Sequence, residues 1–184
     1  MKKWTVSLLA LLFLSGCTAS EQIDRGMSLR SDVLRSSGSF EAIITVDYGD
    51  KSQTFTLDCT FDSFGDLDFE VIEPEVISGI RGSIQDSSGA IKFDDTVLYF
   101  ELLTDEQLSP VSTPWIFIKA LRSGYLTSAG NDGEYLRLSI DDSYEEDALH
   151  LDIWLNTENK PVAAEFIYEE CRILSMEIVN FRFM

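Results

Sequence analysis

His150 is the only histidine in the chain, and it shares a predicted strand face with Asp152 and Trp154. A histidine beside a carboxylate is half of the arrangement that activates a serine or cysteine nucleophile. The sequence contains no Gly-x-Ser-x-Gly, His-Glu-x-x-His or phosphate-loop motif that would complete such a site. A solvent-facing strand position accounts for His150 more simply, so we expect no catalytic residue.

A run of carboxylates between Asp141 and Asp147 could supply the hard oxygen ligands that calcium requires. The run lacks the Asp-x-Asp-x-Asp-Gly spacing of calcium loops, which favours a solvated acidic loop. A glycosidase pair cannot be selected from 32 Asp and Glu residues. The sequence therefore predicts no metal site and no cofactor.

The N-terminal segment has the anatomy of an export signal. Lys2 and Lys3 precede an apolar run from Trp4 to Leu14, which is shorter than the roughly 20 residues of a transmembrane helix. The run ends in Leu14-Ser15-Gly16-Cys17, which resembles the lipobox of bacterial lipoproteins. That resemblance implies cleavage before Cys17, acylation of its thiol and anchoring to the cell membrane outside the cytoplasm. An ordinary cleaved signal is the alternative.

We accordingly expect residues 1–16 to be a signal peptide, residues 17–20 a lipidated tether and residues 21–184 one domain. The chain has a net charge of −18, and removal of the two N-terminal lysines makes it more acidic. Phosphates would repel such a surface, which excludes nucleic acid as a partner. The charge is compatible with a basic envelope protein as partner, and also with a simple role in solubility.

Cys59 and Cys171 remain after lipidation of Cys17. In an extracytoplasmic protein they could form a disulfide, but free cysteines are also common as small buried residues. Both fall in predicted strands with apolar neighbours, which favours two buried thiols.

Two helices are predicted. The first runs from Ser20 to Ser36, with an apolar stripe that holds Ile23, Met27, Arg30 and Leu34 and is widened by Leu29 and Val33. The second runs from Pro114 to Arg122, with Thr113 as its cap and Gly124 at its end. The body of the second helix is apolar nearly all round, so it must be buried on most sides.

Elsewhere the apolar residues alternate, which is typical of half-buried strands. The predicted strands are residues 40–48, 54–62, 67–71, 81–85, 89–94, 97–103, 125–128, 134–140, 148–155, 162–169 and 172–183. The fold class is therefore α+β. We expect a strongly curved antiparallel sheet, an incomplete barrel of about ten or eleven strands that wraps around helices or is covered by them.

The element order resembles the periplasmic lipoprotein-carrier superfamily. The resemblance depends on the strand after the first helix, the strand end at Glu73-Pro74, residues 91–100, the helix 114–122 and the turn Asn159-Lys160-Pro161. It implies an incomplete barrel with helices closing its mouth. The order is also similar to that of clostridial spore-germination lipoproteins, which act by binding a cell-wall amidase.

Three functions follow from these patterns. The first is a lipid-anchored, non-enzymatic protein that binds a lipid or acyl chain inside the curved sheet. Its expected contact residues are Phe55, Leu57, Phe61, Phe69, Phe100, Trp115, Ile118 and Leu121. The second is an acidic scaffold that docks a basic envelope protein such as a cell-wall amidase. The third is an enzyme that uses His150.

Overall fold

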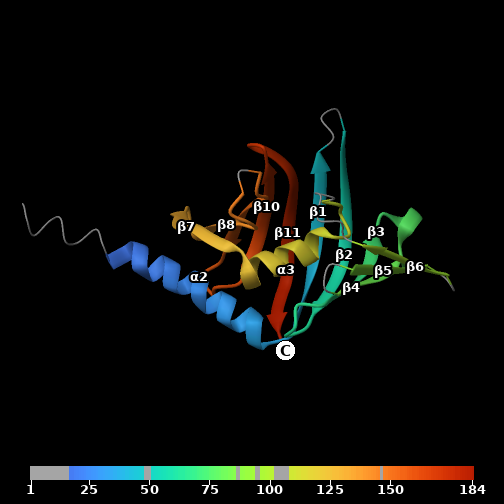
Figure 1. Ribbon diagram of the computed structural model, residues 1–184, viewed down its shortest axis with the longest axis horizontal. Coiled ribbons are helices and arrows are strands. Elements are labelled where there is room, and N and C mark those ends of the chain that lie inside the picture. Colours follow the sequence, from blue (N-terminus) through green and yellow to red (C-terminus); the bar gives the residue numbers. More distant parts are fainter. Residues whose placement is uncertain (1–16, 48–50, 86–87, 94–95, 102–107, 146) are drawn as a thin grey trace, which may run out of the picture.

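The computed structural model describes residues 17–47, 51–85, 88–93, 96–101, 108–145 and 147–184. Figure 1 shows a large curved sheet with helices lying across one of its faces. The helices are α2 (Cys17–Arg35) and α3 (Thr113–Ser123), and a short 3-10 turn, η1, spans Glu75–Ile77. Within these residues, no helix has the length and apolarity needed to cross a membrane.

In the described residues, eleven strands form the sheet, and every neighbouring pair is antiparallel. They are β1 (Gly38–Asp47), β2 (Ser52–Phe61), β3 (Leu67–Glu73), β4 (Arg81–Gln85), β5 (Ser88–Phe93), β6 (Thr96–Glu101), β7 (Tyr125–Asp132), β8 (Tyr135–Asp141), β9 (His150–Leu155), β10 (Pro161–Tyr168) and β11 (Cys171–Phe183). Their spatial order is β6-β5-β4-β3-β2-β1-β11-β10-β9-β8-β7.

The first and last strands meet in the middle of the sheet, where Gly38 of β1 pairs with Phe183 of β11. In the part of the chain that the structure describes, β6 and β7 are the two edges, so the barrel is incomplete. The predicted α+β class and curved antiparallel sheet are confirmed. The half-barrel architecture that the family resemblance implied is also the observed one.

The predicted alternation of apolar residues places one row of side chains in the core. In β2, Leu57, Cys59 and Phe61 are buried, whereas Asp58 and Thr60 are exposed on the outer face. The inner faces of the strands pack against α2 and α3, and together they form one hydrophobic core. The outer face of the sheet is exposed to solvent.

Helix α3 is buried on nearly all sides, as its apolarity predicted. Phe117 and Ile118 are fully buried, and the Phe117 ring lies 5.8 Å from that of Phe40 on β1. Gly124 ends the helix as expected, but the N-cap residue is Ser112 rather than Thr113. Thr113 is already helical, and its hydroxyl donates to the carbonyl of Ser109, 2.8 Å away.

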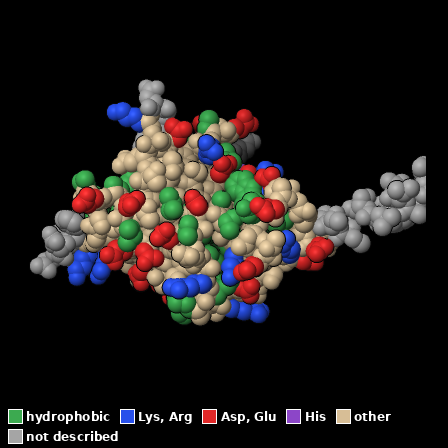
Figure 2. Space-filling view, turned by 180° about the vertical axis from the view of Figure 1, so that it is seen from behind, with side chains coloured by type: hydrophobic (Ala, Val, Ile, Leu, Met, Phe, Trp, Pro, Cys, Tyr) green, Lys and Arg blue, Asp and Glu red, His purple; other side chains and the backbone are tan. Residues whose placement is uncertain are grey.

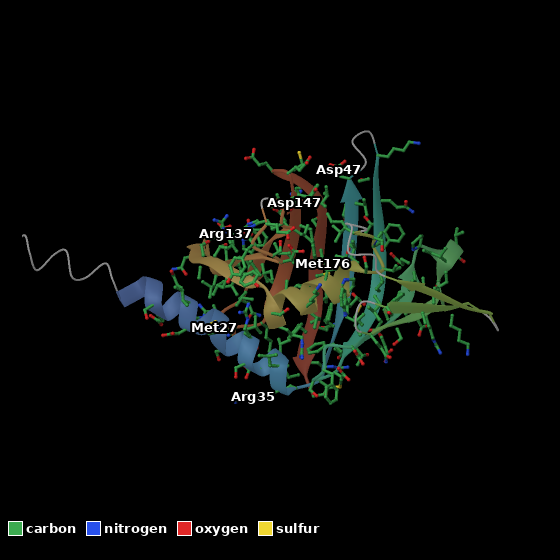
Figure 3. The ribbon with its side chains drawn as sticks, viewed as in Figure 1. Met27, Arg35, Asp47, Arg137, Asp147 and Met176 are labelled. Atoms are coloured by element: carbon green, nitrogen blue, oxygen red, sulfur yellow. The ribbon has the colours of Figure 1, made fainter. Side chains whose placement is uncertain are left out.

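Helix α2 begins at Cys17, so residues 18–20 of the predicted tether continue the helix. The predicted buried stripe is wrong in part, because Ile23, Met27 and Leu34 are 45, 47 and 44% exposed. The buried face contains Leu29 and Val33, which were expected to widen the stripe, together with Gly26. A Cβ at position 26 would lie 3.1 Å from Leu138 of β8, so the single glycine of this helix lies close against the sheet. Figure 3 marks Met27 on α2.

The hairpin between β7 and β8 is tighter than predicted. Strand β7 continues to Asp132, through the residues 130–132 that were expected to form a loop. Gly133 turns the chain with a positive φ of 61°, a conformation that glycine adopts without steric cost.

The two remaining cysteines are both free. Cys59 is buried as expected, and burial raises the pKa of its thiol, with a further contribution from the negative charge of Asp58. Cys171 is exposed, so the expectation of a second buried thiol is wrong. It begins β11 at the hairpin from β10, where it pairs with Tyr168 and lies outside the core.

Candidate functional site

The residues predicted to contact an apolar ligand lie in the core beneath the helices. Most of them are almost fully buried: Leu57 (0% exposed), Phe61 (1%), Phe69 (4%), Trp115 (8%), Ile118 (0%) and Leu121 (2%). Phe55 is half-buried at the edge of this core. Phe100 lies on β6, and its side chain is outside the described residues, as is that of Cys17.

These side chains pack against the rest of the protein in the observed conformation. The ring of Phe61 stacks on Phe181 with centroids 6.0 Å apart, and Phe40 lies 6.3 Å from Phe61. Within the part of the chain that the structure describes, these side chains are covered by α3 and by their neighbours on the sheet. The structure thus brings the predicted residues together as a packed core.

Polar contacts join the two helices to each other. Arg30 of α2 donates to the carbonyl oxygens of Leu121 and Gly124 at 2.8 and 2.6 Å. Arg122 of α3 donates to the carbonyl oxygen of Val33 at 3.1 Å. The Arg30 guanidinium is partly buried, and this desolvation lowers its pKa.

A second set of hydrogen bonds joins α2 to the turn between β9 and β10. Arg25 donates to the carbonyl of Asn156 at 3.0 Å, and the side chain of Asn159 donates to the carbonyl of Arg25 at 3.0 Å. The turn Asn159-Lys160-Pro161, which carried part of the family resemblance, therefore fixes the first helix.

The outer face of the sheet holds a groove of about 620 Å³ that sequence reasoning missed. Its lining residues come from five neighbouring strands: Ile43 and Thr45, Ser175 to Glu177, Val162 to Glu165, Trp154, and Tyr135. We call this hollow the outer groove. Trp154 is half-buried, and its indole Nε1 donates to Asp132 at 2.8 Å, which fixes the ring.

Strand register explains the shape of the outer groove. Ala163 of β10 pairs with Trp154 on one side and with Glu177 on the other. Glu177 in turn pairs with Ile43 of β1. The small side chain of Ala163 between larger neighbours leaves a depression. These neighbouring residues come together only when β1 has paired with β11. No local motif in the sequence could therefore have indicated it.

Carboxylates gather on the same outer face, over β1 to β3. Glu41 pairs with Asp58, and Asp58 pairs with Glu70, so three like charges lie side by side across three strands. Within the described part of the chain, Glu70 accepts a hydrogen bond from Arg81 at 2.9 Å. We call these three residues the carboxylate row. Figure 2 views the molecule from behind and shows acidic side chains spread over this side, with apolar ones between them.

A further hollow of about 470 Å³ lies beside the carboxylate row, over β2 to β5. Asp58 and Glu70 line it together with Asp68, Arg81 and Lys92. This hollow therefore carries both positive and negative side chains, whereas the carboxylate row carries only negative ones.

His150 lies between two carboxylates. Its Nδ1 is 2.6 Å from Asp141 and its Nε2 is 3.4 Å from Asp152, so the half-buried ring bridges β8 and β9. Ser139 donates to Asp152 at 2.6 Å. The serine thus bonds to the carboxylate and not to the imidazole, which differs from a nucleophile held by its general base. Among the described residues, no cluster of His, Cys, Asp and Glu is arranged to hold a metal ion.

No family model matches the sequence, and no curated protein matches it. Among solved structures, the chain is similar to a DUF1329 family protein from Desulfovibrio piger, with a TM-score of 0.52, 10% identity and coverage of 90% of this chain and 92% of that one. At this identity the similarity concerns the fold, and it extends over nearly the whole half-barrel.

Two further structures match at lower scores. A LolA superfamily protein from Nitrosomonas europaea has a TM-score of 0.48 and 9% identity, and 86% of this chain and 93% of that one are covered. The structure of the CwlD amidase from Clostridioides difficile in complex with the GerS lipoprotein matches with a TM-score of 0.44 and 14% identity, over 91% of this chain and 96% of that one.

Proposed function

We propose that this protein is a non-catalytic lipoprotein, anchored outside the cytoplasm by a lipid on Cys17, whose domain is an acidic scaffold for a basic envelope protein. Residues 1–16 are the signal peptide in this proposal, and residues 21–184 are the domain. Helix α2 begins at the anchored residue, so the domain lies close to its membrane.

The observation that carries the proposal is the contrast between the two faces of the sheet. Helices α2 and α3 occupy the inner face, and the predicted contact residues there are buried. The outer face is left for a partner, and it presents the carboxylate row Glu41, Asp58 and Glu70. Like charges directly opposite each other destabilise a sheet, and a basic partner would relieve that repulsion.

Two variants with the same change in net charge test the scaffold. The first, Glu41→Gln/Asp58→Asn/Glu70→Gln, neutralises the carboxylate row. The second, Glu145→Gln/Asp147→Asn/Glu170→Gln, neutralises three exposed residues outside the strands. Full-length protein in nanodiscs is used to capture partners from membrane extract at low and high salt. A purified cell-wall amidase is the first partner to try.

The scaffold predicts that salt and the first variant each weaken the complex, whereas the second variant does not. Equal losses with both variants would mean that net charge alone matters. The absence of a partner at every salt concentration would contradict the proposal. The variant His150→Ala should capture the partner as well as the unmodified protein does, because His150 has no role in docking in this proposal.

A second candidate function is the binding of a lipid or acyl chain under α3. It is supported by the apolar inner surface that α3 covers, since this helix is joined to α2 by hydrogen bonds to main-chain carbonyls that could be broken and remade. The contact residues would be those named above, from Phe55 to Leu121. Native mass spectrometry with lipid extraction tests it, and a protein with no associated lipid and no uptake of a fluorescent fatty acid would count against it.

A further inference from the structure

We propose that the outer groove binds a short extended basic segment of the partner protein, with a lysine or arginine of that segment over the Trp154 ring and paired with Glu177. The inference rests on the proposed scaffold function and assigns it a specific contact site. It differs from the carboxylate row, which lies over β1 to β3 and supplies general attraction.

The apolar lining is the first argument. The solvent face of an antiparallel sheet is normally polar. Here Ile43, Val162, Ala163 and Trp154 lie together on that face, and Tyr135, which is 38% exposed, closes one end. The volume of about 620 Å³ is within the usual range of ligand sites. Such a gathering of apolar and aromatic residues on an outer face is typical of an interaction site.

The fixed position of Trp154 is the second argument. Its indole nitrogen is held by Asp132, and its strand lies between β8 and β10 in the interior of the sheet. A ring fixed on a rigid strand loses little conformational freedom on binding, so it suits the role of an anchor. A cation placed over an indole face is attracted by the π electrons.

Charge selects the occupant. Glu165 and Glu177 line the outer groove, and Glu165 is already paired with Arg172 at 2.6 Å. Glu177 is exposed and has no ion pair among the described residues, so its carboxylate is free to bind a cation. Aromatic rings alone would also suit a neutral glycan. The carboxylate of Glu177, which lies across Ala163 from Trp154, favours a basic peptide segment in a chain of net charge −18.

Full-length protein in nanodiscs is titrated with three probes. These are a hexapeptide of alternating lysine and leucine, the same peptide with glutamate for lysine, and chitohexaose as a neutral glycan. We expect the lysine peptide alone to bind. Trp154→Ala should weaken it about tenfold or more, as expected for a central aromatic anchor. Glu177→Gln should weaken it less and reduce the dependence of affinity on salt.

The matched control is Phe64→Ala. Phe64 is an aromatic residue that is 84% exposed in the turn between β2 and β3, away from the outer groove. Its removal should leave the affinity unchanged. Urea unfolding of each variant separates lost binding from lost folding, and Glu177→Gln, which changes only an exposed group, keeps the test valid if Trp154→Ala is unstable.

Several results would overturn the inference: no binding of the lysine peptide, equal affinity after Trp154→Ala, or preferential binding of chitohexaose. Its failure is distinguishable from failure of the scaffold. If the captured partner is lost from the carboxylate-row variant but retained by Trp154→Ala, the scaffold stands and the groove inference falls. If neither variant affects a captured partner, both fall.

Discussion

Arg30 and Arg122 bind each other's helices. Arg30 of α2 donates to Leu121 and Gly124 at the end of α3, and Arg122 of α3 donates to Val33 near the end of α2. The last carbonyls of a helix have no partner within the helix, and a positive charge there interacts favourably with the helix dipole. The two arginines therefore join α2 and α3 into one unit over the sheet.

Replacement of Arg30 by alanine should lower the free energy of unfolding by about 1 to 3 kcal/mol, because two hydrogen bonds from a charged group are lost. The matched control is Arg35→Ala, an exposed residue in the last turn of the same helix, with an expected effect under about 0.5 kcal/mol. Urea unfolding followed by circular dichroism measures both. Equal effects would show that the contacts to α3 add no stability.

Gly82→Ala should destabilise the β3–β4 contact. A Cβ at this position would collide with the ring of Phe69, which is the partner of Gly82 on the neighbouring strand β3. Displacing a buried ring typically costs about 1 to 3 kcal/mol. Gly130→Ala is the control, because nothing lies within 4 Å of its Cβ position. Thermal unfolding that gives the same Tm for both variants would contradict this packing.

The thiols should differ in reactivity. Thiolate is the reactive form, and burial raises the pKa of Cys59, so little thiolate forms there near neutral pH. Cys171 is exposed and should react quickly with a maleimide. Mass spectrometry of native protein should show one label, on Cys171, and unfolding should add a label on Cys59. Rapid native labelling of Cys59 would show that the core opens.

The proposed lipid anchor gives a separate expectation. Cys17→Ser should remove the acceptor thiol, so the chain should keep residues 1–16 and lose the mass of the acyl groups. Detergent phase partitioning and intact-mass measurement check both. Ser20→Ala, three residues further along α2, is the control and should leave processing unchanged. A Cys17→Ser protein with unchanged mass and partitioning would contradict lipidation.

The strands could be predicted because each one carries its own pattern. Apolar side chains at every second position, as in Leu57, Cys59 and Phe61, require one buried face whatever the partner strand. Helix α3 was similarly indicated by Pro114, Gly124 and its apolar body. These features depend on residues close together in the sequence.

The face that α2 buries could not be predicted in the same way. Hydrophobicity alone predicts that Ile23, Met27 and Leu34 are buried. The helix instead turns Gly26 towards β8, because only a small residue fits in this close contact. The outer groove was missed for a related reason. Its members fall on predicted outer faces of separate strands, and only the pairing of β1 with β11 brings Ile43 beside Glu177.

That central pairing has a consequence for how the protein matures. Strands β1 to β6 follow one another in sequence and are neighbours in the sheet, as are β7 to β11, but β1 can pair with β11 only after all the residues between them have been made. Met184 also donates its backbone N–H to Ser37 at 2.9 Å, next to the start of β1. Contacts between such distant parts of a chain form slowly. The continuous sheet is therefore complete only once β11 has been synthesised and has paired with β1.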